Sequence, residues 1–185
     1  ILALVRNYIP SYGWVVRGGW NIADCVERSY DLEGMNIGTV AAGRIGLAAL
    51  RRLKPFDVKL HYTDKHRLPK AVEEELGLTF HPDVESLVKV CDVVTINAPL
   101  HPETEGMFND KLIAKMKRGA YIVNTARAKI CERDAIVRAL ESGPIRVPEN
   151  YFVVIAKGDE VLDWREMAGR YAGARIKLLE GSDHG

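Results

Sequence analysis

From residue 36 onward the chain alternates short β-rich runs with helical patterns, and this alternation constrains the fold more than any other feature. It is typical of parallel strands joined by right-handed helical crossovers. Several of the runs are continuously apolar, as expected for strands that helices cover on both faces. The sequence therefore predicts a doubly wound α/β sheet of about seven parallel strands. Strands are expected at 36–40, 58–62, 78–80, 93–97, 120–124, 151–156 and 175–179.

The helical patterns fall between these runs and have recognisable ends. Gly77 is a suitable stop for the second helix, and Asn109 or Asp110 is a suitable start for the fourth, which Gly119 would close. Residues 1–35 contain no clear strand, so we expect a lead-in of one or two helices there. Helices of the sheet region are expected around 45–50, 72–76, 84–88, 112–116, 135–140 and 164–171.

Composition excludes several classes of protein. A chain of 185 residues with 47% hydrophobic and 28% charged residues is expected to form one globular domain, spanning 1–185. A net charge of +1 indicates no nucleic-acid partner, and the apolar runs are too short for a membrane span. The three cysteines, Cys25, Cys91 and Cys131, are widely spaced. They argue against disulfides and metal sites and favour a cytoplasmic location.

A glycine-containing turn follows the first predicted strand. Residues 41–46 read A-x-G-x-x-G, the strand–turn–helix context of a dinucleotide-binding fingerprint. Gly43 would admit a pyrophosphate close to the backbone, and Gly46 would let the helix pack against the strand. Ala41 stands where the first glycine is usual, which is tolerable if its φ angle is negative. The turn predicts a Rossmann-like sheet that binds NAD; the alternative is a simple packing turn.

Asp64 lies 18 residues after Gly46, at the end of the second predicted strand. A carboxylate there is expected to bind the adenosine ribose and to favour NAD over NADP. Lys65 and Arg67 follow it and are expected to weaken that preference. The alternative for Asp64 is a solvated surface acid.

Four stretches closely resemble the coenzyme-binding domain of NAD-dependent formate dehydrogenase, within the D-2-hydroxyacid dehydrogenase family. They are GGWNIADCVERSYDLEGMNIGTVAAGRIG (18–46), HYTDKHRLP (61–69), NAPLHPETEGM (97–107) and KRGAYIVNTARAKICERDAI (117–136). The resemblance covers residues 1–143. It implies that NAD is the cofactor and that two coenzyme domains pair in a homodimer.

The resemblance also implies roles at matching positions. Arg44 and Ile45 would cover the pyrophosphate, and Arg127 would bind the substrate carboxylate through its guanidinium. The alternative for Arg127 is a loop cap or an ion pair, and for His101 an ordinary surface histidine. The cofactor-binding residues implied are Ala41, Gly43, Arg44, Ile45, Gly46, Asp64, Pro99, His101, Thr104, Thr125, Ala126 and Arg127.

The remainder of the chain prompts a different resemblance. Residues 148–185 resemble the last strands of an α/β-hydrolase, closest to small bacterial esterases. Asp159 and His184 match the acid and base of a Ser-His-Asp triad, but no serine lies in a G-x-S-x-G motif. The alternative is a loop carboxylate and a solvated terminal histidine.

Together the two resemblances predict an engineered chimera in which a dehydrogenase part, 1–143, meets a hydrolase part, 144–185, at a junction near 143–148. Natural recombination would give the same string. The two resemblances imply one sheet with the strand order 3-2-1-4-5-6-7, in which strands 6 and 7 come from the hydrolase part. Both active sites would be incomplete, with Arg127, Asp159 and His184 as remnants. We therefore expect weak NAD binding and no turnover. The alternative is the NAD-binding fragment of a formate or D-2-hydroxyacid dehydrogenase with oxidoreductase activity.

Overall fold

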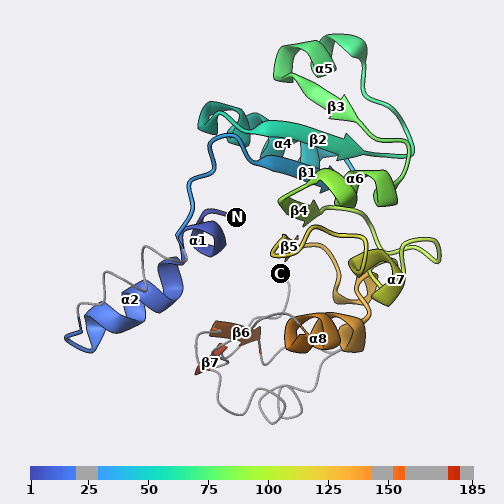
Figure 1. The fold of residues 1–185 in the computed structure, drawn as a ribbon. Helices are drawn as coiled ribbons and strands as arrows, with labels where there is room; N and C mark the ends of the chain where they lie inside the picture. Colours follow the sequence, from blue (N-terminus) through green and yellow to red (C-terminus); the bar gives the residue numbers. More distant parts are fainter. Residues whose placement is uncertain (20–28, 143–151, 157–174, 180–185) are drawn as a thin grey trace. The chain divides into compact units, whose positions relative to one another are not determined.

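The computed structural model describes residues 1–19, 29–142, 152–156 and 175–179 (Figure 1). The chain forms two compact units. The first joins residues 1–5 to residues 30–144, and the second joins residues 6–29 to residues 145–185.

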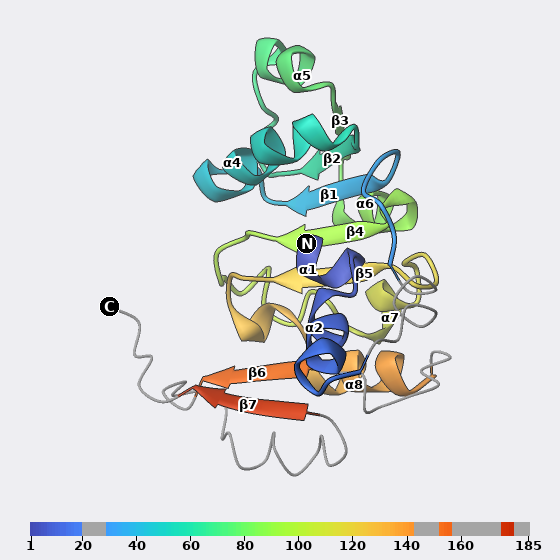
Figure 2. The same ribbon diagram turned by 90° about the vertical axis from the view of Figure 1, so that its left-hand side faces the viewer.

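The first unit is built on a five-stranded parallel sheet in the order β3-β2-β1-β4-β5. The central strand β1 pairs with β2 on one side, where Gly38 lies opposite His61, and with β4 on the other, where Gly38 lies opposite Val94. The arrows of β1, β4 and β5 point the same way in Figure 2. The predicted order of these five strands is confirmed. The strands are β1 (Asn36–Val40), β2 (Lys59–Thr63), β3 (Leu78–Phe80), β4 (Val93–Ile96) and β5 (Tyr121–Asn124).

The two faces of the sheet are covered by separate apolar cores, as the alternation of side chains along a strand requires. Ile37 of β1 belongs to one core, together with Val5, Leu50 and Leu76 from three helices. Val40 belongs to the other core, together with residues that include Leu87 and Phe108. Helices therefore cover both faces, and the predicted doubly wound architecture is confirmed.

The helices begin and end largely where the sequence predicted. Asp83 caps α6 by accepting a hydrogen bond from the backbone N–H of Ser86 at 2.7 Å, and Asn109 caps α7 by accepting one from Leu112 at 3.1 Å. Gly77 ends α5 in the left-handed conformation that glycine adopts without strain. The helices are α1 (Leu2–Val5), α4 (Arg44–Leu53), α5 (Lys70–Leu76), α6 (Val84–Val90), α7 (Asp110–Ile113) and α8 (Arg133–Ser142), with 3₁₀ turns η1 (Lys54–Phe56) and η2 (Ala128–Ile130).

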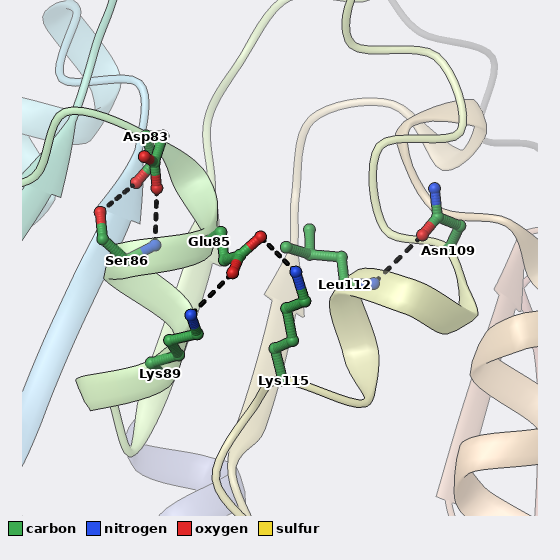
Figure 3. Close-up of polar contacts among 7 residues, drawn as sticks. All are labelled: Asp83, Glu85, Ser86, Lys89, Asn109, Leu112 and Lys115. Atoms are coloured by element: carbon green, nitrogen blue, oxygen red, sulfur yellow. Dashed lines mark hydrogen bonds and ion pairs between the residues drawn. The ribbon is translucent and has the colours of Figure 1, made fainter.

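Helix α7 is shorter than predicted, and charged contacts beyond its end tie this part of the chain to α6. Glu85 on α6 accepts hydrogen bonds from Lys89, at 2.7 Å, and from Lys115, which lies just past α7 (Figure 3). The two ammonium groups lower the pKa of the Glu85 carboxyl to about 2, with Lys115 the larger cause. The expected helix up to Gly119 is wrong, because the chain after Ile113 turns back toward β5 instead of continuing the helix.

The described part of the second unit contains α2 (Tyr8–Val16) and the strands β6 (Phe152–Ala156) and β7 (Arg175–Leu179). The two strands pair with each other in parallel, with Phe152 opposite Arg175. The predicted order placed them beyond β5 in one continuous sheet, whereas they form a separate two-stranded sheet. A local pattern identifies a buried strand but not the sheet edge it joins, because that choice depends on long-range packing.

Candidate coenzyme site

The predicted cofactor residues follow the carboxyl ends of four neighbouring parallel strands. The 41–46 turn follows β1, Asp64 follows β2, Pro99 to Thr104 follow β4, and Thr125 to Arg127 follow β5. Because parallel strands end at the same edge of a sheet, these loops lie along one edge. Ligands of doubly wound folds bind at such an edge, where the strand order reverses between β1 and β4.

The turn after β1 is held by close backbone packing. A Cβ atom at Gly46 would lie 2.2 Å from the carbonyl oxygen of Ala41, so only glycine fits there. A Cβ atom at Gly43 would meet nothing within 4 Å, and Gly43 is exposed. Gly46 therefore packs the helix against the strand, and Gly43 leaves the approach to the backbone open, as predicted from the spacing.

Ala41 departs from the expectation for this turn. Its φ angle is +71°, in the left-handed region, whereas the sequence argument required a negative value. The backbone is held there because the Ala41 N–H donates to the Thr63 carbonyl at 2.9 Å and its carbonyl accepts from the Thr39 hydroxyl at 2.8 Å. The turn adopts the conformation of the usual first glycine even though the residue is alanine, which strains the backbone.

Asp64 is hydrogen-bonded to the glycine-containing turn that follows β1. Its Oδ2 accepts a hydrogen bond from the backbone N–H of Ala42 at 2.7 Å, and its Oδ1 accepts one from the N–H of His66 at 2.9 Å. Each carboxylate oxygen retains a further lone pair, so the group still has acceptor capacity for ribose hydroxyls. Backbone donors therefore fix the position of both oxygens of the Asp64 carboxylate.

The start of α4 is open to an anion. Gly43 is its N-cap residue and provides no side-chain hydrogen bond, and no acidic residue lies in the first turn of this ten-residue helix. The first N–H groups of the helix are thus available to phosphate oxygens, aided by the helix dipole. A surface depression adjoins this end of the helix and is lined by Gly43, Arg44, Ile45, Ala48, Ala49, Arg52 and Asn97. The donors, the acid and the open approach together fit a dinucleotide.

Asn97 is a site residue that the sequence analysis did not single out. It is half-buried, lines the depression, and donates from Nδ2 to the Thr39 hydroxyl at 2.9 Å. Its backbone N–H also donates to the Val40 carbonyl at 2.9 Å. Asn97 thereby ties the end of β4 to the end of β1 beneath the site. A polar side chain directly after a buried strand was the available signal.

The loop after β4 is organised by Thr104, whose side chain is buried. The Thr104 hydroxyl donates to the Pro99 carbonyl at 2.7 Å and accepts from the His101 N–H at 2.8 Å. Pro99 and His101 themselves are exposed. Thr104 therefore shapes the loop from within, and it leaves Pro99 and His101 on the surface.

Arg127 is exposed after β5, and its Nη1 donates to the carbonyl of the preceding residue, Ala126, at 3.1 Å. Among the described residues no acidic side chain forms an ion pair with it. The loop is held by Asn124, which sequence reasoning missed: its Nδ2 donates to the Arg127 carbonyl and its Oδ1 accepts from the Ala126 N–H, both at 3.0 Å. Thr125, between Asn124 and Ala126 in the sequence, is exposed.

Asp159 and His184, the predicted hydrolase pair, lie outside the described residues. In the part of the chain that is described, no helix has the length and apolar character needed to cross a lipid bilayer.

Comparison with known proteins identifies the family. Residues 1–148 match the family described as "D-isomer specific 2-hydroxyacid dehydrogenase, NAD binding domain". Formate dehydrogenase of Pseudomonas sp. (strain 101) is 69% identical over 143 residues, covering 77% of this chain and 36% of that protein. Formate dehydrogenase of Candida boidinii is 42% identical over 174 residues, covering 92% of this chain and 47% of that protein. The chain thus spans less than half the length of these relatives.

Solved structures give the same assignment. A formate dehydrogenase from Granulicella superimposes with a TM-score of 0.80 at 56% identity, over 97% of this chain and 46% of that one. The NAD-dependent formate dehydrogenase from Staphylococcus aureus, in complex with NAD, superimposes with a TM-score of 0.75 at 33% identity, over 97% of this chain and 51% of that one.

These matches overturn the predicted chimera. The junction expected near 143–148 lies inside the matched family range, and the relative from Candida boidinii aligns over 174 residues, well into the segment assigned to a hydrolase. No finding supports a hydrolase part. Alternating strands and helices occur in every doubly wound fold, so the pattern of residues 148–185 did not distinguish one α/β family from another. The chain belongs to the D-isomer-specific 2-hydroxyacid dehydrogenase family and contains its NAD-binding domain, with NAD as the cofactor.

Proposed function

We propose that this chain forms the coenzyme-binding part of an NAD-dependent formate dehydrogenase and that Arg127 binds the formate carboxylate. The observation that carries the proposal is the common edge of the sheet, where the phosphate-binding turn, Asp64 and Arg127 follow the ends of neighbouring strands. The relatives named above as formate dehydrogenases support the choice of substrate.

The cofactor would be held by groups that are already in place. The N–H groups at the start of α4 would receive the pyrophosphate, with Arg44 and Ile45 covering it. Asp64, fixed by the N–H groups of Ala42 and His66, would accept hydrogen bonds from the adenosine ribose. The remaining proposed contacts are exposed or half-buried at the same edge: Ala41, Pro99, His101, Thr125 and Ala126, with Thr104 shaping the loop from inside.

The substrate would be recognised by charge and shape. Formate is a small planar carboxylate, and a guanidinium group matches it with two parallel hydrogen bonds. Arg127 keeps donors available because only Nη1 is bonded to a neighbouring carbonyl. Bound NAD supplies the acceptor for the hydride that formate loses as it becomes carbon dioxide. The role of Arg127 is to hold the carboxylate in line, which requires the loop that Asn124 braces.

The test is to incubate the 185-residue chain with formate and NAD and to follow NADH by its absorbance. The proposal predicts formate-dependent NADH formation that is reduced at least tenfold in Arg127→Lys, because an ammonium group cannot form the bidentate contact. Arg118→Lys, at an exposed position in the loop before β5, is the matched control. NADH formation that is equally fast in Arg127→Lys would assign substrate binding to another group.

The proposal extends to a homodimer. Helix α2 carries exposed apolar side chains on Tyr8, Tyr12, Val15 and Val16, with the two tyrosine rings stacked at 6.2 Å. Apolar side chains gathered on one exposed helix favour association with another protein surface. Light scattering should give twice the monomer mass, and Tyr12→Lys should shift the population toward the monomer. A monomeric mass for the unmodified chain would contradict the dimer.

A further inference from the structure

Two basic residues follow the ribose-binding acid, and each is paired with a carboxylate. Lys65 donates to the Glu103 carboxylate, and Arg67 donates to both oxygens of Glu73, at 2.9 and 3.0 Å. A cation close to this acid is what a 2′-phosphate on the ribose would need, since that group distinguishes NADP from NAD. The two cations that would weaken the preference for NAD are therefore both occupied.

The two pairs differ in how firmly they are held. Glu73 has a side chain only 10% exposed and also accepts from the Tyr62 hydroxyl at 2.5 Å, while Arg67 lies 5.0 Å from the centre of the Phe80 ring. Arg67 is thus locked by several contacts. Lys65 and Glu103 are 68% and 67% exposed, and their pair has no comparable support.

The Lys65–Glu103 pair also crosses the site. Lys65 lies in the loop after β2, and Glu103 lies in the loop after β4. These strands flank β1 on opposite sides, so the pair links the two loops on either side of the strand that ends in the phosphate-binding turn. Lys65 directly follows Asp64, the acid proposed to bind the ribose, in the sequence.

The pair is too exposed to contribute much to stability, because solvent screens an isolated surface ion pair. Its effect on charge near the ribose is more direct. Glu103 holds the Lys65 ammonium group and thereby withholds it from an incoming phosphate. The ammonium group in turn lowers the pKa of the Glu103 carboxyl.

We propose that Glu103 is a coenzyme-specificity residue that disfavours NADP by holding Lys65 across the site. The proposal rests on the NAD-binding function of this crevice and adds a residue outside the phosphate-binding turn and outside Asp64. It predicts that loss of the Glu103 carboxylate frees Lys65 to meet a 2′-phosphate.

The experiment titrates NADH and NADPH, followed by fluorescence, into the 185-residue chain and into Glu103→Gln. The ratio of NADPH to NADH affinity is expected to rise about fivefold in Glu103→Gln, in keeping with the strength of an exposed charge pair. The gain should shrink in high salt, because the freed charge is screened. An unchanged ratio would overturn the proposal.

Two control variants test whether the change in the affinity ratio depends on the Glu103 carboxylate and on Lys65. Glu105→Gln removes an exposed carboxylate from the same loop and should leave the ratio unchanged. The double variant Lys65→Met/Glu103→Gln should lose the gain, whereas a gain that persists without Lys65 would overturn the proposal. If the unmodified chain binds no NADH, both the proposed coenzyme function and this inference are wrong. NADH binding with an unchanged ratio refutes the role of Glu103 alone.

Discussion

The carboxylate of Asp64 accepts a hydrogen bond from the backbone N–H of Ala42 at 2.7 Å, which joins the end of β2 to the phosphate-binding turn after β1. The Asp64 side chain thereby fixes the turn that faces the pyrophosphate in the proposed function, and it is also the acid proposed to bind the ribose. We therefore predict that this contact couples binding of the adenosine ribose to binding of the pyrophosphate.

Replacement of this acid should weaken coenzyme binding strongly. In Asp64→Ala the Ala42 and His66 N–H groups lose their acceptor, and the ribose loses its partner. We expect the NADH affinity, measured by fluorescence titration, to fall about 10- to 100-fold, as for the loss of charge-assisted hydrogen bonds. Asp57→Asn, at an exposed position after η1, should bind NADH normally. Equal affinities of the two variants would contradict the role assigned to Asp64.

Substitution of the two glycines of the turn by alanine should have different effects, one on stability and one on coenzyme binding. Gly46→Ala puts a methyl group 2.2 Å from the Ala41 carbonyl oxygen, so we expect the free energy of unfolding to fall by about 3 kcal/mol or more. Gly43→Ala meets no neighbouring atom and has a φ angle of −66°, so its fold should remain stable. Its methyl group would instead obstruct the pyrophosphate and lower NADH affinity about tenfold or more.

Urea unfolding and NADH titration of both glycine variants separate the two effects. A Gly43→Ala protein that binds NADH as tightly as the unmodified chain would show that the coenzyme does not approach the backbone at this turn. A fully stable Gly46→Ala protein would contradict the close contact.

Ala41→Gly should stabilise the protein. The residue has a φ angle of +71°, and glycine adopts this conformation without the clash of a Cβ atom. After allowance for the greater freedom of glycine in the unfolded chain, we expect a gain of about 0.5–1 kcal/mol in the free energy of unfolding. Ala42→Gly, at a buried neighbour whose φ angle is not positive, should destabilise. A loss of stability in Ala41→Gly would refute the strain.

Stability should also depend on His61. Its Nε2 lies 3.1 Å from Asn36 Oδ1, which can only accept, so Nδ1 must accept from Nε2–H of His81 at 3.0 Å. Burial, then the neighbouring His81 and Lys117, lower the pKa of His61 to about 4, against a smaller opposing effect of Asp92. Because the folded protein favours the neutral form of His61, the stability linked to this residue is fully present above the ordinary pKa of 6.5. It is lost as the pH falls toward 4 and the histidine of the unfolded chain becomes protonated.

We expect the free energy of unfolding to fall by about 2 kcal/mol between about pH 7.5 and about pH 5. Urea unfolding at the two pH values measures it. His61→Gln should flatten this dependence, whereas His66→Gln, at an exposed histidine, should leave it intact. The same slope in His61→Gln as in the unmodified chain would place the titrating group elsewhere.

Much of the site could be predicted from sequence because its residues mark strand ends. The 41–46 turn and Asp64 were found from spacing alone, since a strand, a tight turn and a helix impose that spacing. Asn97 was missed because its side chain donates to Thr39, which is distant in sequence. Asn124 was missed because its hydrogen bond to the Arg127 carbonyl forms only when the loop after β5 is folded. The tail was assigned to the wrong family because its strand–helix–strand pattern is shared by many α/β proteins.

The sequence by itself determined the α/β architecture and the position of the glycine-containing turn, because apolar periodicity and glycine spacing are local properties of the chain. The five-strand order of the main sheet followed from the resemblance to a known family and not from any local pattern. Only the tertiary structure decided the left-handed backbone at Ala41, the separate pairing of β6 with β7, and the Lys65–Glu103 contact between two loops. Each of these depends on which segments meet in space, and that depends on the packing of the whole chain rather than on any one segment.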